Sequence, residues 1–141
     1  MTAPPRRPLH LLLVDDNPGD VRLVREALRS SGGKTRVSTA TDGVEALEAL
    51  RAAAPEDRPD LVLLDLNLPR LDGRETLRAL RADPALRSLP TIIFSSSTAA
   101  ADVEACLALG ADAYVTKPAD FEGFERELLR LESTWSDRRA S

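Results

Sequence analysis

The chain contains one cysteine, Cys106, and one histidine, His10, among its 141 residues. A single cysteine excludes an internal disulfide and is typical of the reducing cytoplasm, where we expect the protein to function. A single histidine excludes a metal site built from several imidazoles. Cys106 lies at a core position of a helix-like segment and His10 lies in a strand-like run, so we expect structural roles for both.

Long apolar runs and an excess of positive charge are also absent. No run approaches the roughly 18 apolar residues that a membrane-spanning helix needs. The segment LHLLLV at residues 9–14 is short, and the DDNP that follows it is unlike a signal-peptide cleavage site. The net charge is −4, whereas general nucleic-acid binders need a basic face. We therefore expect neither a membrane nor a nucleic acid as a partner.

The length fits one ordinary domain. We expect a flexible lead at residues 1–7, one domain over residues 8–135 and a short tail at residues 136–141. Since so few residues follow the last expected helix, we expect no attached DNA-binding module, and output through protein contacts.

Apolar segments of strand length alternate with amphipathic segments of helix length. The pattern predicts strands at residues 9–14, 34–40, 60–65, 91–95 and 112–116. It predicts helices from Pro18 to the Gly32-Gly33 pair and at residues 43–53, 73–82, 99–109 and 119–135. The strand at 34–40 alternates polar and apolar residues as an edge strand does, whereas the strand at 60–65 is almost continuously apolar. This alternation predicts a three-layer α/β domain with an open parallel sheet.

Polar side chains follow four of the expected strands where each strand ends. Asp15 and Asp16 follow the first, Asp65 ends the third, Ser95 ends the fourth and Lys117 follows the fifth. Ligand sites of open parallel sheets lie at these carboxyl ends. Two like charges about 4 Å apart repel by roughly 4 kcal/mol at an effective dielectric near 20, so converging carboxylates need compensation. A divalent cation such as Mg²⁺, which prefers oxygen ligands, would supply it, and Lys117 would add positive charge.

Each of these residues also has a plain structural explanation. Asp16 or Asn17 would simply cap the following helix. Asp65 would be a turn residue, Ser95 a polar strand end and Lys117 a surface side chain. For these explanations to hold together, four strand ends must carry suitable groups by chance. A phosphoryl-transfer site needs a nucleophilic oxygen, a metal, a hydroxyl donor and a cation, and this sequence supplies the residues for all four.

The fragments VDDN, LLDLNLPRLDG, FSSS and AYVTKP together resemble the response-regulator receiver family of two-component signalling, over about residues 8–135. The resemblance implies a flavodoxin-like or CheY-like doubly wound sheet with strand order 2-1-3-4-5. It also implies a signalling protein that accepts a phosphoryl group from a sensor histidine kinase. Such a protein catalyses only its own phosphorylation and dephosphorylation, so we do not expect an enzyme.

The resemblance assigns Asp65 as the phosphoacceptor. Asp16 and Asp65 would bind Mg²⁺ directly, and the backbone carbonyl of Asn67 would be the third protein ligand. Asp15 would act through a metal-bound water. Mn²⁺ is a second metal that suits such a site.

Further roles follow from the same resemblance. Ser95 would hydrogen-bond the phosphoryl group and Lys117 would pair with its oxygens, although two more serines directly after Ser95 leave a register alternative. Pro118 would follow a cis peptide bond. Tyr114 would be the aromatic switch that changes rotamer when phosphorylation draws the Ser95 loop inward. A half-buried strand aromatic is the alternative for Tyr114.

The NPGD start, the DLNLP segment and the late LEST…W ending resemble the stand-alone regulators of bacterial phytochrome kinases. This narrower resemblance implies a phytochrome-type kinase as the phosphoryl donor.

Apolar residues recur along the last expected helix with 3-4-3-4 spacing. They are Phe121, Phe124, Leu128, Leu131 and Trp135. Packing against the sheet explains part of this stripe, but Trp135 lies beyond the family's usual core and is harder to bury within one subunit. We therefore predict a homodimer through the last helix and tail.

Two other functions fit part of the pattern. A haloacid-dehalogenase-like hydrolase also has a nucleophilic Asp at a strand end, but it needs a second Asp two positions on. Asn67 occupies that position and has no proton to exchange. A pseudo-receiver that works without phosphate is the second alternative, and the intact acidic set with Lys117 argues against it.

Overall fold

The computed structural model describes the backbone of residues 8–30 and 35–140, and the side chains as far as residue 136. The strands are β1 (His10–Val14), β2 (Arg36–Ala40), β3 (Leu61–Leu64), β4 (Thr91–Ser95) and β5 (Ala113–Thr116). The helices are α1 (Pro18–Arg29), α2 (Gly43–Ala52), α3 (Gly73–Ala82), α4 (Ala100–Ala108) and α5 (Phe121–Ala140), with a short 3-10 turn η1 (Pro55–Asp57). The expected lead at residues 1–7 and the expected helix end at Gly32-Gly33 lie outside the described residues.

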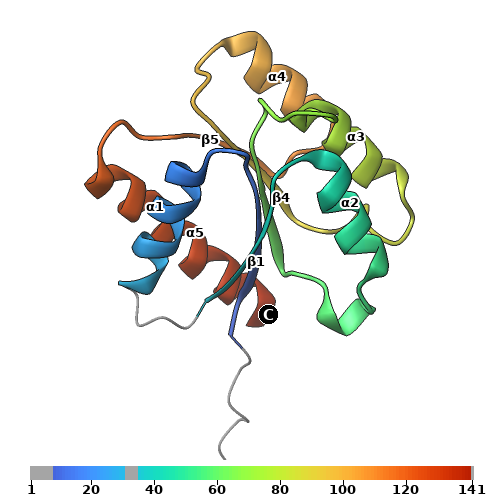
Figure 1. Ribbon diagram of the computed structural model, residues 1–141, viewed down its shortest axis with the longest axis horizontal. Helices are drawn as coiled ribbons and strands as arrows, with labels where there is room; N and C mark the ends of the chain where they lie inside the picture. Colours follow the sequence, from blue (N-terminus) through green and yellow to red (C-terminus); the bar gives the residue numbers. More distant parts are fainter. Residues whose placement is uncertain (1–7, 31–34, 141) are drawn as a thin grey trace, which may run out of the picture.

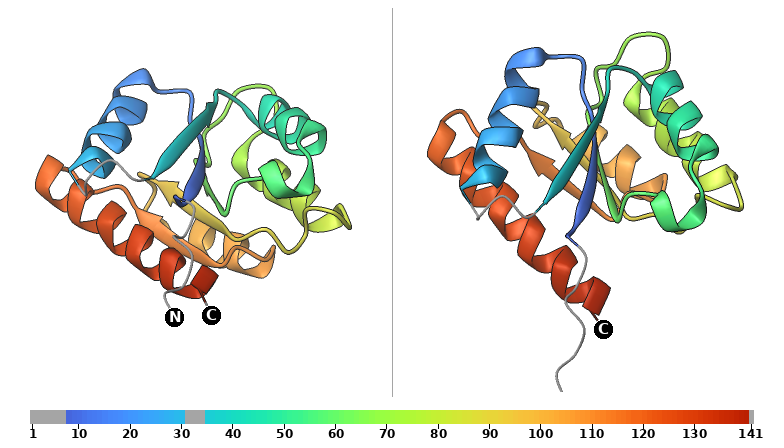
Figure 2. Two further views of the ribbon diagram at one scale, coloured as in Figure 1. Left: turned by 90° about the horizontal axis from the view of Figure 1, so that it is seen from below. Right: turned by 60° about the horizontal axis from the view of Figure 1, so that its bottom comes forward.

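The five strands form one parallel sheet in the order β2-β1-β3-β4-β5, which confirms the expected topology. Helices α1 and α5 cover one face of the sheet, and α2, α3 and α4 cover the other (Figures 1 and 2). β2 lies at one edge, as its alternating pattern predicts. All four strand pairs run parallel, so every strand presents its carboxyl end at the same edge of the sheet.

Side-chain caps set the start of three helices at that edge. The Asn17 side chain accepts hydrogen bonds from the backbone of the first turn of α1, and Pro18 is the first helical residue. Asp42 caps α2 in the same way. Asp72 forms a capping box with Glu75 at the start of α3. Asn17 is therefore the cap of α1, and Asp16 is not needed for that purpose.

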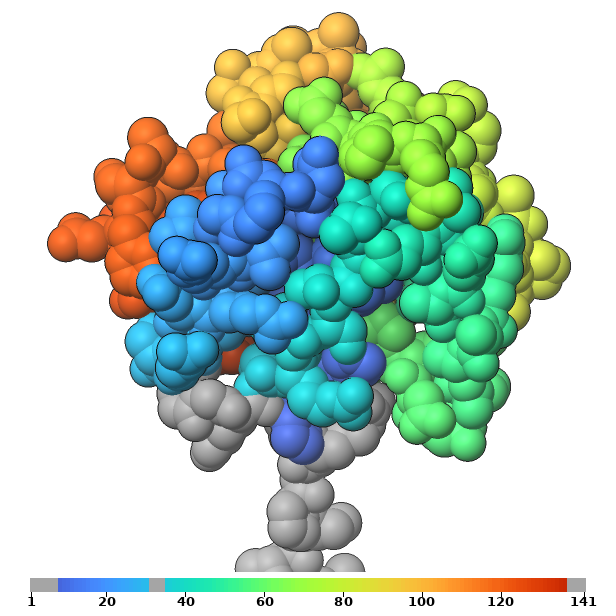
Figure 3. All heavy atoms as spheres, in the orientation of Figure 1, coloured from blue at the N-terminus to red at the C-terminus, as the bar shows by residue number. Residues whose placement is uncertain are grey.

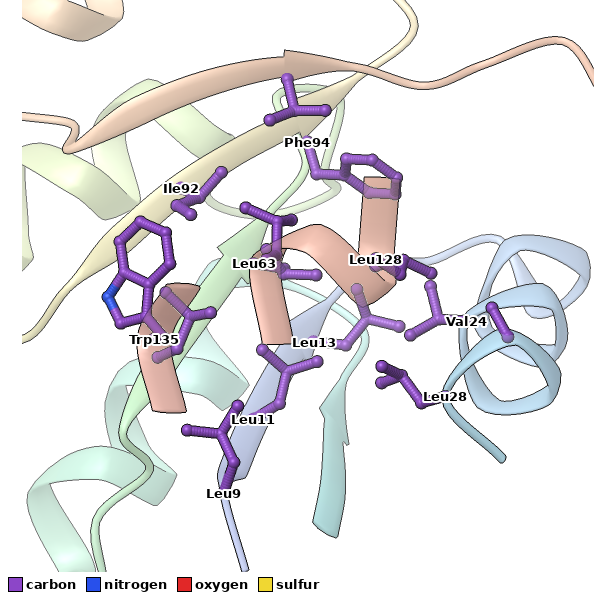
Figure 4. Close-up of a cluster of buried hydrophobic side chains, with 14 of the residues drawn as sticks. Leu9, Leu11, Leu13, Val24, Leu28, Leu63, Ile92, Phe94, Leu128 and Trp135 are labelled. Carbon is purple, nitrogen blue, oxygen red and sulfur yellow. The ribbon is translucent and has the colours of Figure 1, made fainter. Parts of the chain in front are cut away.

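The core on the α1 and α5 face contains Trp135, which is 7% exposed (Figure 4). It belongs to one cluster with Leu9, Leu11 and Ile92 of the sheet side. The expectation that Trp135 is hard to bury within one subunit is therefore wrong. The reason is that Trp135 packs against side chains of the sheet, in one cluster with Leu63 and Ile92. Helix α5 itself continues to Ala140, five residues past its expected end at 135.

The strands alternate their side chains between the two faces, as the two-residue period of a strand requires. Leu11 and Leu13 enter the α1 and α5 core, whereas Leu12 and Val14 enter the core under α2, α3 and α4. Cys106 is fully buried in this second core, and burial raises the pKa of its thiol.

His10 is nearly buried at the start of β1, and its Nε2 lies 2.8 Å from Ser38 Oγ on β2. The structural roles expected for Cys106 and His10 agree with these positions. Within the described residues, no helix is both long enough and apolar enough to cross a bilayer.

Candidate functional site

The carboxyl edge of the sheet carries the candidate site. The loops after β1 (blue), β3 (green) and β4 (gold) gather at the upper end of the molecule in Figure 3. Backbone pairing continues just past the strand ends. The N–H of Asp15 donates to the Ala40 carbonyl at 3.0 Å, and the N–H of Asp65 donates to the Val14 carbonyl at 3.0 Å. These bonds fix both aspartates relative to the sheet.

Three carboxylates converge there. One oxygen from each of Asp15, Asp16 and Asp65 lies within 4.8 Å of the other two. Asp15 and Asp65 are buried and Asp16 is exposed, so the cluster opens to solvent on the Asp16 side. Oxygens about 2.1 Å from one Mg²⁺ lie at most about 4.2 Å apart, which is close to the 4.8 Å limit of this cluster. The donor set is that of a hard divalent cation.

Lys117 inserts its ammonium group among the carboxylates. Its Nζ lies 2.8 Å from Asp15 Oδ2, 2.7 Å from Asp20 Oδ2 and 3.0 Å from Asp65 Oδ2. Its side chain is 9% exposed, so these ion pairs are poorly screened by solvent.

The burial of these charges shifts two pKa values. Burial alone lowers the pKa of Lys117, but its hydrogen bonds to Asp15 and Asp20 outweigh burial and leave that pKa raised. Burial raises the pKa of Asp15, although its bond to Lys117 opposes the change. The raised pKa of Lys117 keeps its ammonium charged. The desolvation of the site is seen instead in the raised pKa of Asp15.

Ser95 ends β4 beside the lysine. Its backbone carbonyl accepts a hydrogen bond from Lys117 N–H at 2.8 Å, which continues the pairing of β4 with β5. Its side chain is fully buried, and its Oγ accepts a hydrogen bond from the Ser97 N–H at 3.3 Å. The expected hydroxyl therefore lies on the same strand end that positions Lys117.

Tyr114 is tied to the loop that follows Ser95. Its ring is half-buried on β5, and its hydroxyl donates to the Ser97 carbonyl at 2.8 Å. Ser97 Oγ in turn donates to Asp102 Oδ2 at 2.5 Å, and Asp102 pairs with Arg74 of α3. Ser97 thus connects Ser95, Tyr114 and the start of α4.

The loop after β3 carries Asn67 and is held from two sides. The Asn67 N–H donates to Asp65 Oδ1 at 3.3 Å. Arg70 adopts a positive φ of 62° and binds Asp42 at the start of α2 through two nitrogens, at 2.8 and 3.1 Å. Gly73 packs so closely that an added Cβ would lie 2.3 Å from the Asp65 carbonyl oxygen. These contacts determine where the Asn67 carbonyl can lie.

Comparison with known proteins identifies the family. Residues 11–128 match the family model of the response regulator receiver domain. The chain belongs to this family.

This receiver is similar to Response regulator Rcp1 of Synechocystis sp., with 34% identity over 91% of this chain and 89% of Rcp1. The crystal structure of the Mn²⁺-bound form of Rcp1 covers 91% of this chain and 94% of its own, with a TM-score of 0.80. The phosphorylated cyanobacterial phytochrome response regulator RcpA is 38% identical, covers 90% of this chain and 93% of its own, and gives a TM-score of 0.83. A third similar structure is the receiver domain of the histidine kinase PA1611 from Pseudomonas aeruginosa, with a magnesium ion in its active-site cleft. It is 32% identical, covers 89% of this chain and 98% of its own, and has a TM-score of 0.70.

One expectation for the receiver site is wrong, and two contacts were not predicted. The described residues contain no cis peptide bond, so the bond before Pro118 is trans. The trans form is the intrinsically favoured one before proline, by about 0.5–1 kcal/mol. Sequence reasoning also missed Asp20, which resembles an ordinary first-turn acid, and Arg70. No residue pattern signals the pairing of Arg70 with Asp42, because it depends on the positive φ at Arg70.

Proposed function

We propose that this receiver accepts a phosphoryl group on Asp65 from a partner histidine kinase, in a Mg²⁺-dependent reaction. The observation that supports it most is the convergence of Asp15, Asp16 and Asp65 around the Lys117 ammonium. The Lys117 ammonium lies 3.0 Å from Asp65 Oδ2, so the proposed nucleophilic oxygen has a cation beside it, as phosphoryl transfer requires.

In the proposed transfer, an oxygen of Asp65 forms a bond to phosphorus. The phosphorus–nitrogen bond of the kinase phosphohistidine breaks at the same time, and the imidazole leaves with the electron pair. Asp16, Asp65 and the backbone carbonyl of Asn67 would hold Mg²⁺, with Asp15 acting through a bound water. Mn²⁺ would suit the same oxygens. A divalent ion held there neutralises charge on the phosphoryl oxygens.

Lys117 and Ser95 would bind the transferred group. The Lys117 ammonium already lies 3.0 Å from Asp65 Oδ2, so a phosphoryl group on Asp65 would come within its reach. The Ser95 hydroxyl would donate to a phosphoryl oxygen, which requires the chain at Ser97 to adjust. The Tyr114 hydroxyl donates a hydrogen bond to the Ser97 carbonyl. This adjustment would therefore either break that hydrogen bond or move the Tyr114 side chain together with the loop. Tyr114 would thereby report phosphorylation to the face formed by α4 and β5.

The partner is proposed from the relatives. Rcp1 and RcpA, at 34% and 38% identity, support a phytochrome-type histidine kinase as the donor. A haloacid-dehalogenase-like hydrolase would need a titratable group at Asn67, and a pseudo-receiver would not need the Lys117 cluster. We propose a cytoplasmic protein with output through protein contacts. The single free Cys106 and the net charge of −4 support this proposal.

A homodimer through α5 and the tail stays a proposal. Trp135 no longer supports it, because that side chain is buried within the chain. The remaining support is Phe121, an exposed aromatic at 41% exposure at the start of α5. Light scattering over the micromolar range would show a dimer if the proposal holds. A monomer at every concentration would contradict it.

Incubation with acetyl phosphate and Mg²⁺, followed by intact mass measurement, tests the phosphoacceptor. We expect one added phosphoryl group on the wild type, none after treatment with EDTA and none on Asp65→Asn. Asp57→Asn, a change at an exposed acid on η1, is the matched control and should label like the wild type. Equal labelling of Asp65→Asn would move the acceptor to another residue.

A further inference from the structure

Lys117 contacts three carboxylates, and one of them lies outside the proposed metal and phosphoryl shell. Asp15 and Asp65 would turn their charge toward the ion and the phosphoryl group. Asp20 belongs to α1 and makes the shortest of the three contacts, 2.7 Å from Nζ. The Asp20 side chain is 25% exposed, so solvent screens this ion pair less than it screens a pair on the open surface.

Each of the three carboxylates around the ammonium accepts one of its hydrogen bonds. A lysine ammonium has three donors, and the structure offers one acceptor oxygen for each, at 2.7, 2.8 and 3.0 Å. When phosphate arrives on Asp65, the donors aimed at Asp15 and Asp65 become available for phosphoryl oxygens. The donor to Asp20 has no such competing partner.

We propose that Asp20 is the positioning residue for Lys117, holding its ammonium so that two donors face the phosphoryl group on Asp65. The inference rests on the function proposed above and deepens it. Asp20 does not touch the reacting atoms in this arrangement, and it acts through Lys117.

The first turn of α1 is built to hold Asp20 in place. The Asn17 side chain accepts hydrogen bonds from the N–H groups of Gly19 at 2.8 Å and Asp20 at 3.2 Å. This cap fixes the backbone of Asp20 relative to the β1 strand end. The Lys117 ammonium also lies 5.9 Å from the centre of the Phe94 ring. The lysine head therefore has both a carboxylate on a capped helix turn and an aromatic ring as neighbours.

A role of Asp20 in positioning Lys117 and a role through its charge alone predict different results for two variants. Asp20→Asn removes the negative charge but keeps an oxygen that accepts a hydrogen bond from Lys117. Asp20→Ala removes both the charge and the acceptor. If Asp20 acts only through its charge, both variants change phosphoryl binding alike. If Asp20 positions Lys117, the Ala variant is impaired and the Asn variant is not.

The test measures the affinity of beryllium trifluoride, an anion that mimics a carboxylate-bound phosphoryl group, by ¹⁹F NMR at saturating Mg²⁺. We expect Asp20→Asn to bind within about twofold of the wild type. Asp20→Ala should bind about tenfold more weakly, because a charge-assisted hydrogen bond that orders the cation is lost. In a Lys117→Ala background, Asp20→Ala should have no further effect. Glu122→Gln removes a first-turn acid from α5 and should match the wild type.

Mg²⁺ affinity and the urea midpoint, measured on the same variants, separate positioning from a structural role. A structural role would lower the urea midpoint of Asp20→Ala and leave the anion affinity unchanged. Asp20→Ser, whose side chain is too short to reach Nζ, replaces the Ala variant if the latter does not fold. Equal anion affinity in the Asn and Ala variants, whether tight or weak, overturns the inference. Failure of the wild type itself to bind beryllium trifluoride overturns the proposed function instead.

Discussion

Lys117 offsets the buried negative charge at the ends of two strands, so its removal should lower the free energy of unfolding. Without the ammonium, Asp15 and Asp65 are left at 2% and 8% exposure with no cation. Breaking a buried ion pair from one side costs about 3–5 kcal/mol. We expect Lys117→Ala to lower the free energy of unfolding by about 3 kcal/mol without Mg²⁺, in urea titrations followed by circular dichroism.

Added Mg²⁺ should recover part of that loss, since the ion replaces the missing positive charge. Arg130→Ala is the control, because Arg130 pairs with Glu127 on the surface and is 66% exposed. Its effect should stay below about 1 kcal/mol. Equal destabilisation by the two changes would contradict the electrostatic role of Lys117.

Asp42 gives a pH dependence with a defined sign. The hydrogen bond from Arg70 holds the pKa of Asp42 below its ordinary value of 3.8. A lowered folded-state pKa means that the stabilisation is present above pH 3.8 and is lost as the pH falls through the lower value. Between pH 7 and pH 3, the wild type should therefore lose more unfolding free energy than Asp42→Asn.

Urea titrations at pH 7, 4 and 3 measure that difference. Arg70→Ala should shrink it, because the group that lowers the pKa is gone. Asp57→Asn, at an exposed acid, should follow the wild-type curve. A wild type and Asp42→Asn that lose stability in parallel would rule out the Arg70 pairing as its source.

The sequence predicts those site residues that follow strands directly. Asp15, Asp65 and Lys117 could be placed together because parallel strands end at one edge. Asp20 could not, since its contact depends on how far the first turn of α1 leans over the lysine. Arg70 could not either, because a positive φ at an arginine has no signature in the residue pattern.

At the scale of helices and strands, α5 tests whether its apolar stripe serves the core or an interface. Trp135 packs in the cluster with Leu9 and Leu11. Truncation of a buried tryptophan costs about 3–5 kcal/mol. We expect Trp135→Ala to lose that much stability in urea titrations, by the same amount at every protein concentration.

Phe121→Ala is the control on the same helix, and its stability loss should be below about 1 kcal/mol because the ring is 41% exposed. A loss at Trp135 that shrinks with dilution would instead show that Trp135 stabilises an assembly.

Gly73 tests how tightly α3 sets the loop after β3. An added Cβ would lie 2.3 Å from the Asp65 carbonyl oxygen and 2.6 Å from Leu66 Cα, which are backbone atoms that cannot rotate away. We expect Gly73→Ala to lose about 1–3 kcal/mol of stability and to weaken Mg²⁺ binding, measured by urea titration and calorimetry.

Gly123→Ala is the matched control, because its added Cβ would lie 2.9 Å from the Asp120 side-chain oxygen and 3.0 Å from Pro118 Cβ, and both neighbours are side-chain atoms. Its Mg²⁺ affinity should equal that of the wild type. Normal metal binding by Gly73→Ala would show that the loop has more freedom than its packing indicates.

The element pattern was predictable because strands and helices alternate with clear apolar periods and capping residues. The end of α5 was not predicted correctly. The segment after Trp135, SDRRA, contains no glycine or proline that would end a helix, and its polar residues are also typical of a tail.

At the scale of the whole molecule, the fold places the opposing charges that follow three strands, β1, β3 and β5, at one edge of one sheet. The two cores on either face hold the strands rigid, and the strand ends therefore deliver their carboxylates to fixed positions. The carboxylates that repel one another in the metal-free protein are the ligands that an ion would use. Metal binding and folding are then linked, and a metal at 100 times its dissociation constant adds about 2.7 kcal/mol of stability.

A calorimetric titration with Mg²⁺ tests this account most directly. The account predicts one ion per chain for the wild type, and binding at least about tenfold weaker for Asp16→Asn, whose carboxylate lies within 4.8 Å of the other two. Binding by Asp16→Asn as tight as that of the wild type, or no binding by either protein, would contradict it.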